Sequence, residues 1–144
     1  MLVQAILKSK ASNEVVTVPA SATVSEAAAI LAEKRIGTVV VSDDGKTALG
    51  IFSERDIVRE LAASGSGCLT QNVSAYMTVN VVTCTVDVTA QSVLAQMTEG
   101  RFRHMPVVEG DKLIGIVTLG DVVKAQLSEL AMEKDALEGM IMGH

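Results

Sequence analysis

Short β-branched runs alternate with longer helical patterns along the first part of the chain. Val15–Val18 is a β-branched run that stops at Pro19, which predicts a short strand or extended segment. Thr23 is followed three residues later by Glu26, and this hydroxyl–carboxylate pair predicts a capping box at a helix start. The Ala-rich stretch that follows is expected to be helical to Arg35, with Gly37 ending the helix.

Two more strands and a second helix are predicted next. Thr38–Val41 is a continuous β-branched run, which indicates a buried strand. Asp43–Gly45 is a hairpin turn signal, so Ala48–Phe52 is expected to return antiparallel to that strand. A helix is then expected to begin at Ser53 or Glu54. The predicted order of elements is therefore β-α-β-β-α.

The second part of the chain repeats this order. Val15–Ser42 aligns with Val81–Val108 at an offset of 66 residues, and Asp56 aligns with Asp121 at an offset of 65. Neither copy is large enough to bury much core alone, so we predict an α/β fold of two pseudo-symmetric copies packed face to face. The strands and helices of the second copy are expected at Val81–Thr83, Thr89–Gly100, Met105–Val108, Leu113–Val117 and from Leu119 onward.

The segment between the copies, Ala63–Thr78, begins with Gly and Ser residues, which predicts a flexible connector. Its end, "VSAYMT", predicts a short helical turn. At the start of the chain, Val3, Ile6 and Leu7 form an apolar helical face that needs a partner. We divide the chain into a first repeat with its N-terminal helix, a linker, a second repeat and a C-terminal helical extension, at residues 1–65, 66–78, 79–128 and 129–144.

The last helical pattern continues beyond the second repeat. Its apolar positions fit a heptad seam with Lys134 in one gap, and they are Val123, Leu127, Leu130, Leu137 and Ile141. This seam predicts a contact between two subunits, so the protein is expected to form a homodimer. The alternative is a helix that packs only on its own module.

Composition narrows the classes of partner. Hydrophobic residues make up 49% of the 144 residues and aromatic residues only 2%, which predicts a globular chain with an aliphatic core. The net charge of −5 argues against nucleic acid or an anionic membrane as a general partner, but it permits a small anionic ligand. No apolar run approaches the roughly 20 residues that span a bilayer, and no signal peptide is seen, so a cytoplasmic location is expected.

The sequence offers little support for catalysis. It has no Ser/His/Asp set, no glycine-rich phosphate loop with a following Lys, and no cluster of metal ligands. Cys68 and Cys84 are too few for a disulfide framework and lack metal-ligand spacing, so two free thiols are expected. A redox switch through these two cysteines remains an alternative.

One phrase occurs in both copies, as "GIFSERD" and "GIVTLGD". It places Ser53 three residues before Asp56, and Thr118 three residues before Asp121, where a helix follows a strand. A helix N-terminus offers unpaired N–H groups to an anion, and a carboxylate one turn later can accept hydrogen bonds from a ribose diol. The same spacing also describes a plain helix cap. Both interpretations stay open at this point.

These features together resemble a tandem CBS-domain module, named after cystathionine β-synthase. The matching motifs are "VVTV" and "VVTC", "GTVVVSDDG" and "RHMPVVEGD", the repeated phrase, and "VSAYMT" before the second copy. The resemblance covers nearly the whole chain. It implies two clefts related by a pseudo-twofold axis that accept adenosine nucleotides or, in some members, NAD or S-adenosylmethionine.

The resemblance also implies which residues contact the ligand. The extended segments before the first helix of each copy would contact the adenine through Thr17, Val18, Val82 and Thr83. The starts of the middle strands would line the base and ribose with Thr38, Val39, His104, Met105 and Pro106. The repeated phrase would reach phosphate and ribose with Ser53, Arg55, Asp56, Thr118, Gly120 and Asp121.

Positive side chains lie beside these positions. Arg103 can place two N–H groups on a phosphate, and His104 can hydrogen-bond a phosphate or ribose. The alternatives are a solvated arginine and a packed neutral histidine. Arg55 sits in the first turn of a helix, where a cation opposes the helix dipole and an anionic ligand would remove the conflict. The second copy lacks this arginine, so the two sites cannot be chemically alike.

We expect the site with Thr118, Asp121 and His104 to be the more typical nucleotide site, because the first copy has "TVV" in place of "HMP". The predicted protein is a non-enzymatic regulatory module without a catalytic cofactor. It would bind AMP, ADP, ATP or NAD between its repeats and signal to an unidentified effector protein. The alternative is a dimeric interaction scaffold whose clefts are vestigial.

Overall fold

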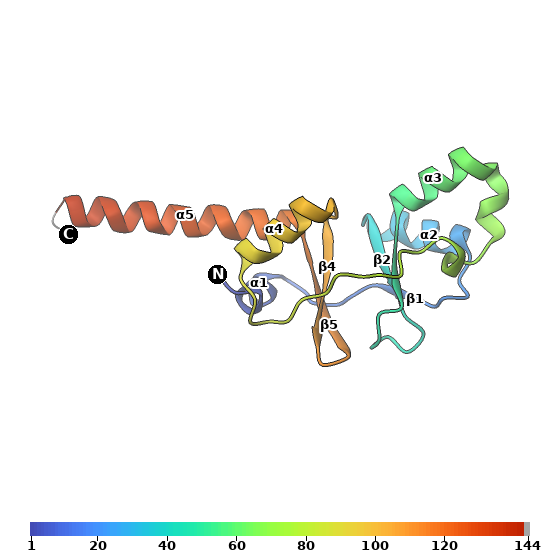
Figure 1. Ribbon diagram of the computed structural model, residues 1–144, viewed down its shortest axis with the longest axis horizontal. Coiled ribbons are helices and arrows are strands. Elements are labelled where there is room, and N and C mark those ends of the chain that lie inside the picture. The colour runs from blue at the N-terminus through green and yellow to red at the C-terminus, as the bar shows by residue number, and fades with distance from the viewer. Residues whose placement is uncertain (143–144) are drawn as a thin grey trace.

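The computed structural model describes residues 1–142, which form two lobes that lie side by side (Figure 1). The first lobe holds β1 (Thr17–Val18), α2 (Val24–Lys34), β2 (Thr38–Val41), β3 (Gly50–Ser53) and α3 (Glu54–Ser64). The second lobe holds α4 (Ala90–Gly100), β4 (His104–Glu109), β5 (Lys112–Thr118) and α5 (Leu119–Ile141). The predicted pair of β-α-β-β-α repeats with a C-terminal helix is confirmed. None of the described helices is both long enough and apolar enough to cross a bilayer.

Local chemistry sets the helix starts as the sequence predicts. Thr23 and Thr89 each accept a hydrogen bond from the backbone N–H three residues later, at the starts of α2 and α4. The helix α2 ends at Lys34, one residue before the predicted end at Arg35. The left-handed residue that ends it is not Gly37 but Arg35, with φ of 55°. Its repeat equivalent Arg101 does the same with φ of 57° and ends α4.

The two sheets share one plan, but the second lacks a strand. In the first lobe β1 pairs parallel to β2, and β2 pairs antiparallel to β3. In the second lobe β4 and β5 are antiparallel, and only a single parallel bridge joins Cys84 to Val107. The predicted strand at Val81–Thr83 is therefore wrong, and Val82 is exposed.

Pro106 explains the missing strand. In the first lobe Val40 N–H donates to the Val16 carbonyl at 3.1 Å and holds the start of β1 against β2. The repeat equivalent of Val40 is Pro106, which has no N–H to offer to the carbonyl of Val82. Cys84 still pairs with β4, because its N–H donates to Pro106 at 3.0 Å and its carbonyl accepts from Val108 at 2.9 Å.

The aliphatic core is divided into one cluster in each lobe, and both clusters include residues from segments outside the β-α-β-β-α repeats. One cluster includes Val18, Leu31, Val41 and Phe52 from the first lobe. The other includes residues of the second lobe and of the N-terminal helix. Among the fully buried large side chains, Phe52 supplies the aromatic ring and the rest are Met or Val. The core is therefore built from aliphatic side chains, as the composition predicts.

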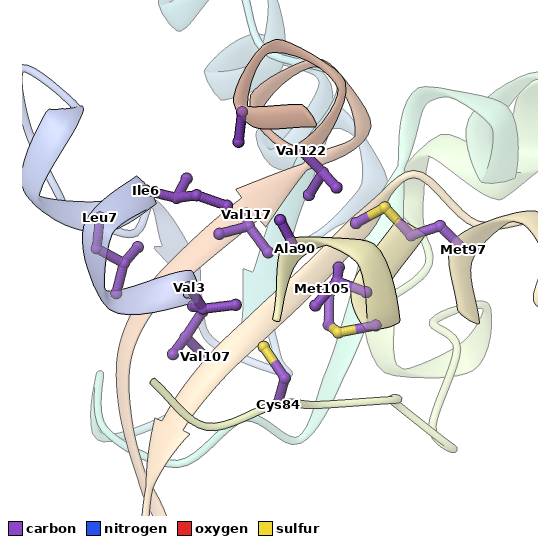
Figure 2. Packing of buried hydrophobic residues seen from close by; sticks show 12 residues of the cluster. Val3, Ile6, Leu7, Cys84, Ala90, Met97, Met105, Val107, Val117 and Val122 are labelled. Carbon is purple, nitrogen blue, oxygen red and sulfur yellow. The ribbon is translucent and has the colours of Figure 1, made fainter. Parts of the chain in front are cut away.

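The N-terminal helix α1 (Val3–Ser9) precedes the first repeat in sequence but packs on the second lobe. Figure 2 shows its Val3, Ile6 and Leu7 directed toward the strands that carry Val107 and Val117. Val3 N–H donates to the Val88 carbonyl at 2.9 Å, which ties α1 to the segment ahead of α4. The apolar face predicted at the start of the chain therefore finds its partner in the other repeat.

The segment between the repeats makes the reciprocal contact. It folds as two short 3-10 helices, η1 (Gly65–Thr70) and η2 (Val73–Ala75), with Cys68 and Val73 buried, so the expected flexible connector is wrong. Val73 N–H donates to the Ala22 carbonyl of the first lobe at 2.8 Å. This bond matches that of Val3 to Val88, so residues near 3 and near 73 are equivalent at an offset of 70.

We predict that Ile6→Ala destabilises the second lobe rather than the first. Removal of a buried Ile side chain should cost about 2–5 kcal/mol of unfolding free energy, measured by urea denaturation. Hydrogen exchange should quicken at Val117 in β5 more than at Val40 in β2, because α1 covers the second core. The exposed Gln4→Ala is the control in the same helix. Faster exchange in the first lobe alone would contradict the exchanged packing.

Candidate functional site: a cleft between the repeats

The two repeats touch at equivalent residues. Thr38 begins β2, His104 begins β4, and these positions match at the offset of 66. The Thr38 hydroxyl oxygen and His104 Nδ1 form a hydrogen bond of 3.2 Å. Because equivalent residues of the two repeats meet here, the contact lies at the pseudo-twofold axis that relates the copies. A cleft beside this contact is therefore lined by both copies.

A cleft of about 550 Å³ opens beside this contact, a size typical of sites for small ligands. Both repeats line it. The first lobe and its following segment contribute Gly37, Thr38, Ile51, Ser53, Glu54, Arg55, Asp56, Arg59 and Thr78. The approach to the second lobe and that lobe itself contribute Asn80, Val81, Val82, Gly100, Arg101, Phe102, Arg103 and His104.

At the floor of the cleft, the phrase of the first copy forms a complete capping box. Asp56 accepts from the Ser53 N–H at 2.8 Å and from its hydroxyl at 3.1 Å, both on Oδ2. The other carboxylate oxygen accepts from the Arg59 guanidinium at 2.6 Å. Asp56 is buried and both of its oxygens have partners. The helix-cap interpretation of the phrase therefore holds, and a ribose diol would have to compete with Arg59 for this carboxylate.

Positive charge is in excess along the cleft. It holds four arginines and two acidic residues, and one arginine, Arg59, is already paired with Asp56. The Glu54 carboxylate lies close to Gly37, so a side chain added at Gly37 would meet it at 3.4 Å. Among the described residues, no carboxylate lies within 4.0 Å of the three remaining arginines, Arg55, Arg101 and Arg103. This surplus suits an anionic ligand.

His104 is neutral at pH 7 in this environment. Burial of its ring lowers the pKa of His104, because burial disfavours the charged form. The nearby charges of Arg103 and Arg55 lower this pKa further. The carboxylates of Asp121 and Glu54 act in the opposite direction but do not outweigh these causes. A neutral imidazole can keep its bond to Thr38 and still offer Nε2 to a ligand.

The phrase of the second copy is closed by a lysine from outside it. Asp121 accepts from the Thr118 N–H at 2.9 Å, and Asp121 N–H donates to the Thr118 hydroxyl at 3.1 Å. Lys10 Nζ donates to the same Asp121 carboxylate at 3.0 Å and to the Ile116 carbonyl at 2.9 Å. At the offset of 70, Lys10 corresponds to Asn80, which lines the cleft of the first copy. Lys10 therefore binds one carboxylate oxygen of Asp121, Oδ2, from the position where the other crossing segment has Asn80.

The lysine also affects the titration of Asp121. Partial burial alone would raise the pKa of this carboxyl group, but hydrogen bonds from Thr118 and Lys10 and the lysine charge lower it below 3.8 overall. Asp121 is therefore charged and paired at neutral pH.

The cleft gathers seven of the residues predicted from the sequence: Thr38, Ser53, Arg55, Asp56, Val82, Arg103 and His104. It does not include the other nine, which are Thr17, Val18, Val39, Thr83, Met105, Pro106, Thr118, Gly120 and Asp121. Val18, Val39 and Met105 point into the lobe cores, because successive strand residues face opposite sides. The cleft thus lies at the phrase with Ser53 and Asp56, and of the site expected to be the more typical one it includes His104 but not Thr118 or Asp121.

Several lining residues were missed from the sequence. Arg101 and Phe102 follow α4, and the left-handed backbone at Arg101 turns the chain into the cleft. Thr78 and Asn80 lie just after η2, where the chain leaves the first lobe for the second. Thr78 N–H donates to the Ile51 carbonyl at 2.8 Å. The offset of 70 between Lys10 and Asn80 was the signal that could have found this part of the wall.

The two cysteines give no support to a redox switch. Cys68 is buried under the first lobe, and Cys84 lies in the core of the second, where burial raises its pKa to about 11. A thiol with a raised pKa is a poor nucleophile at neutral pH. Within residues 1–142, no group of three or more His, Cys, Asp or Glu side chains is arranged to hold a metal ion.

Comparison with known proteins identifies the family. The family model for the CBS domain matches residues 5–63 and 73–128, once for each repeat. The chain belongs to the CBS-domain family. Residues 64–72, which include η1, lie outside both matches. The second match begins at Val73, which packs in the core of the first lobe.

Relatives of this CBS-domain chain are found in archaea, bacteria and plants. An uncharacterized 17.7 kDa protein of Acidianus ambivalens is 34% identical over 124 residues, 85% of this chain and 74% of the relative. The CBS domain-containing protein CBSCBSPB5 of Arabidopsis thaliana is 33% identical, but the matched part is only 22% of its length. The crystal structure of a CBS-domain containing protein from Agrobacterium tumefaciens is 45% identical, with a TM-score of 0.83 over 88% of this chain and 99% of that one.

Two other solved structures contain ligands. A CBS domain protein from Pyrobaculum aerophilum complexed with AMP is 26% identical, with a TM-score of 0.78 over 92% of this chain and 99% of that chain. The CBS domain pair of protein MJ0100 is in complex with 5′-methylthioadenosine and S-adenosyl-L-methionine. It is 27% identical, with a TM-score of 0.77 over 90% of this chain and 98% of that chain.

We predict that Lys10→Met lowers stability at neutral pH and reduces the stability lost on acidification. The lowered pKa of Asp121 adds stability above its ordinary value of 3.8, and this contribution is lost as the pH falls through the lowered value. Removing the partly exposed ion pair should cost about 1 kcal/mol or less at pH 7, by urea unfolding. The two proteins should converge in acid. Lys8→Met, in the last turn of α1 just before Lys10, is the control, and an equal loss for it would contradict a specific pair.

Proposed function

We propose that this protein is a regulatory module that binds an adenine nucleotide in the cleft between its two CBS repeats. The observation that carries the proposal is the cleft itself, which is shared by both repeats and carries three arginines with no carboxylate within 4.0 Å among the described residues. The AMP, 5′-methylthioadenosine and S-adenosyl-L-methionine in the structurally similar proteins support an adenosine ligand. The candidates for this chain are AMP, ADP, ATP and NAD.

The lining of the cleft divides by chemistry. Ile51, Val81 and Val82 offer apolar surface on which an adenine ring can lie, with Thr78 and Asn80 beside them for its polar edge. The arginines lie on the side where α3 begins and α4 ends. Guanidinium groups bind phosphate oxygens through paired N–H donors. A nucleotide would therefore place its base toward the segment 78–82 and its phosphate toward Arg55 and Arg103.

One nucleotide per chain is expected. The cleft of the first copy is open, whereas Lys10 occupies the equivalent carboxylate in the second copy. This differs from the symmetric expectation of two sites. The difference between the two sites follows from one pair of equivalent positions. Asn80 lies in the segment before the second repeat, and Lys10 lies in the segment before the first.

Ligand binding at this boundary can be transmitted to α5. His104 lines the cleft and pairs with Thr118 in the β4–β5 ladder, and Thr118 is the N-cap of α5. A nucleotide that contacts His104 and Arg103 would favour one arrangement of the two lobes and so one direction of α5. An effector protein, or a second copy of the chain, would read that direction. CBS-domain proteins are generally regulatory and non-catalytic, and we propose the same here, in the cytoplasm.

An interaction scaffold with vestigial clefts is the second candidate. It is favoured by one observation, the ion pairs of Asp56 with Arg59 and of Asp121 with Lys10, with which a ribose diol would have to compete. A scaffold would show no ligand-dependent change in stability, whereas a sensor gains stability from its ligand by mass action.

We predict that AMP raises the melting temperature of the protein and that GMP raises it much less. Arg103→Gln should weaken AMP binding by about tenfold or more in calorimetric titration, because a charged hydrogen bond to phosphate is worth about 1.5–3 kcal/mol. Lys112→Gln removes the same charge at the opposite end of the β4–β5 ladder and should bind AMP normally. No shift with any adenine nucleotide would favour the scaffold, and equal shifts with GMP would contradict base recognition.

We also propose that α5 joins two copies of the chain. Figure 1 shows α5 extending away from the second lobe, and the predicted seam residues Leu127, Leu130 and Leu137 are each more than half exposed. Apolar side chains repeated along one face of a projecting helix are buried when a second helix packs on them. Two copies can cover each other's seams in this way.

We predict that replacing both Leu127 and Leu130 with Glu produces a monomer, measured by light scattering, because the seam would then carry charge. The helix itself should be retained in circular dichroism, since Glu is a good helix former and both positions are exposed. Replacing the nearby exposed Glu133 and Glu138 with Gln is the control and should leave the mass of the particle unchanged. A dimer that survives the double substitution would show that α5 is not the essential contact.

A further inference from the structure

A second, smaller compartment adjoins the cleft. It has a volume of about 260 Å³ and is lined by Arg55, Met97, Thr98, Arg101, Phe102, Arg103 and Leu119. Four of these residues, the three arginines and Phe102, also line the cleft. The two spaces are therefore neighbours that share one wall, and the shared wall is made mostly of arginine.

The charge of this compartment differs from that of the cleft. Its lining includes three arginines and no acidic residue, whereas the cleft also contains Glu54 and Asp56. Among the described residues, Arg55, Arg101 and Arg103 have no carboxylate within 4.0 Å. Three like charges around one space repel one another, and an anion of several charges would relieve that repulsion.

The surroundings of His104 agree with this picture. Arg55 and Arg103 line the cleft together with His104, and their charges lower the pKa of its ring. The fold therefore brings arginines from both repeats together here: Arg55 from the start of α3, and Arg101 and Arg103 from the turn between α4 and β4.

AMP has a single phosphate and would leave the second compartment empty. With its base toward segment 78–82 and its α-phosphate at the shared wall, no group of AMP would enter the second compartment. A nucleotide with further phosphates would continue through the wall to the side lined by Thr98 and Leu119. Each added phosphate brings at least one more negative charge to arginines that have no other partner.

We propose that the second compartment is a polyphosphate subsite, so that the ligand class of this protein is adenosine di- and triphosphate rather than the monophosphate. This inference rests on the function proposed above and specifies its ligand. We expect Arg101 to distinguish the ligands, because it caps α4, the helix whose Met97 and Thr98 line only the second compartment, while Arg103 serves the first phosphate. The sensor would then report the energy-rich forms of the nucleotide.

The helix C-terminus offers another explanation for Arg101, and the chain contains the control for it. Arg101 caps α4, where a cation is favourable to the helix dipole. Arg35 caps α2 with nearly the same left-handed backbone and is equally exposed, but it lines neither space. Arg35→Gln and Arg101→Gln therefore make the same chemical change in the same backbone setting, and only the second removes a compartment residue.

A second matched pair tests the compartment by adding charge. Thr98 is exposed on α4 and lines only the second compartment, and its hydroxyl donates to the Leu94 carbonyl of its own helix. Thr98→Glu would place a carboxylate in that compartment without touching the cleft. The repeat equivalent of Thr98 is Ala32, which is also exposed on α2, so Ala32→Glu is its control.

The experiment is calorimetric titration of the full chain with AMP, ADP and ATP, in buffer with chelator and without divalent cations. The unchanged protein should bind ATP at least tenfold more tightly than AMP, with ADP between them. Arg101→Gln and Thr98→Glu should each remove most of that ratio and change AMP affinity by less than about twofold. Arg35→Gln and Ala32→Glu should keep the ratio.

The outcomes separate this inference from the function on which it rests. Equal affinity for AMP, ADP and ATP in the unchanged protein would overturn the polyphosphate subsite and leave nucleotide sensing intact. A loss of AMP and ATP affinity by the same factor in Arg101→Gln would also overturn it, because Arg101 would then hold the first phosphate. If none of the three nucleotides binds, the proposed function itself fails.

Discussion

The reciprocal exchange of segments between the two repeats is the constraint on which this structure depends. Each lobe is completed by a segment that precedes the other repeat in the chain. Val3 binds the Val88 carbonyl of the second lobe, and Val73 binds the Ala22 carbonyl of the first. The apolar faces of both segments are buried in the core of the lobe they reach. The chain therefore crosses between the lobes twice, after α1 and after η2, and these two connections and the Thr38–His104 hydrogen bond hold the boundary where the cleft lies.

The two repeats place equivalent residues at two equivalent positions, and single differences between the repeats make these two positions unlike. Asn80 in one crossing segment leaves the cleft of the first copy open, while Lys10 in the other places an ammonium group on Asp121. Pro106 removes the N–H that would hold Val82 in a strand, and the freed segment lines the open cleft. Positive charge then collects on one side, where Arg55 replaces the equivalent glycine of the second copy. A pseudo-symmetric fold has thus produced an asymmetric binding surface.

The repeated phrase has a structural role at a helix start in both copies. Both copies form capping boxes at the starts of α3 and α5, and each Asp accepts hydrogen bonds from its own helix start and from a neighbouring cation. A cap contributes roughly 1 kcal/mol, which is enough reason for a helix to begin there. The positive surplus of the cleft comes instead from arginines beside the phrase. The contribution of the phrase to binding is then to position Arg55 and the helix N-terminus at the shared wall.

The sequence by itself determined the repeat, the order of strands and helices, the helix starts and seven residues of the cleft. These depend on short-range rules, namely β-branched runs, hydroxyl caps and turn signals, and on an alignment of the chain with itself. The tertiary structure decided which lobe α1 completes, that Lys10 closes the second carboxylate, and that Arg101 and Asn80 join the wall. Lys10 and Asp121 are 111 residues apart, and their meeting depends on the exchange of segments between repeats. No local pattern of residues encodes that exchange, because an apolar helical face specifies that it must be buried but not by which partner.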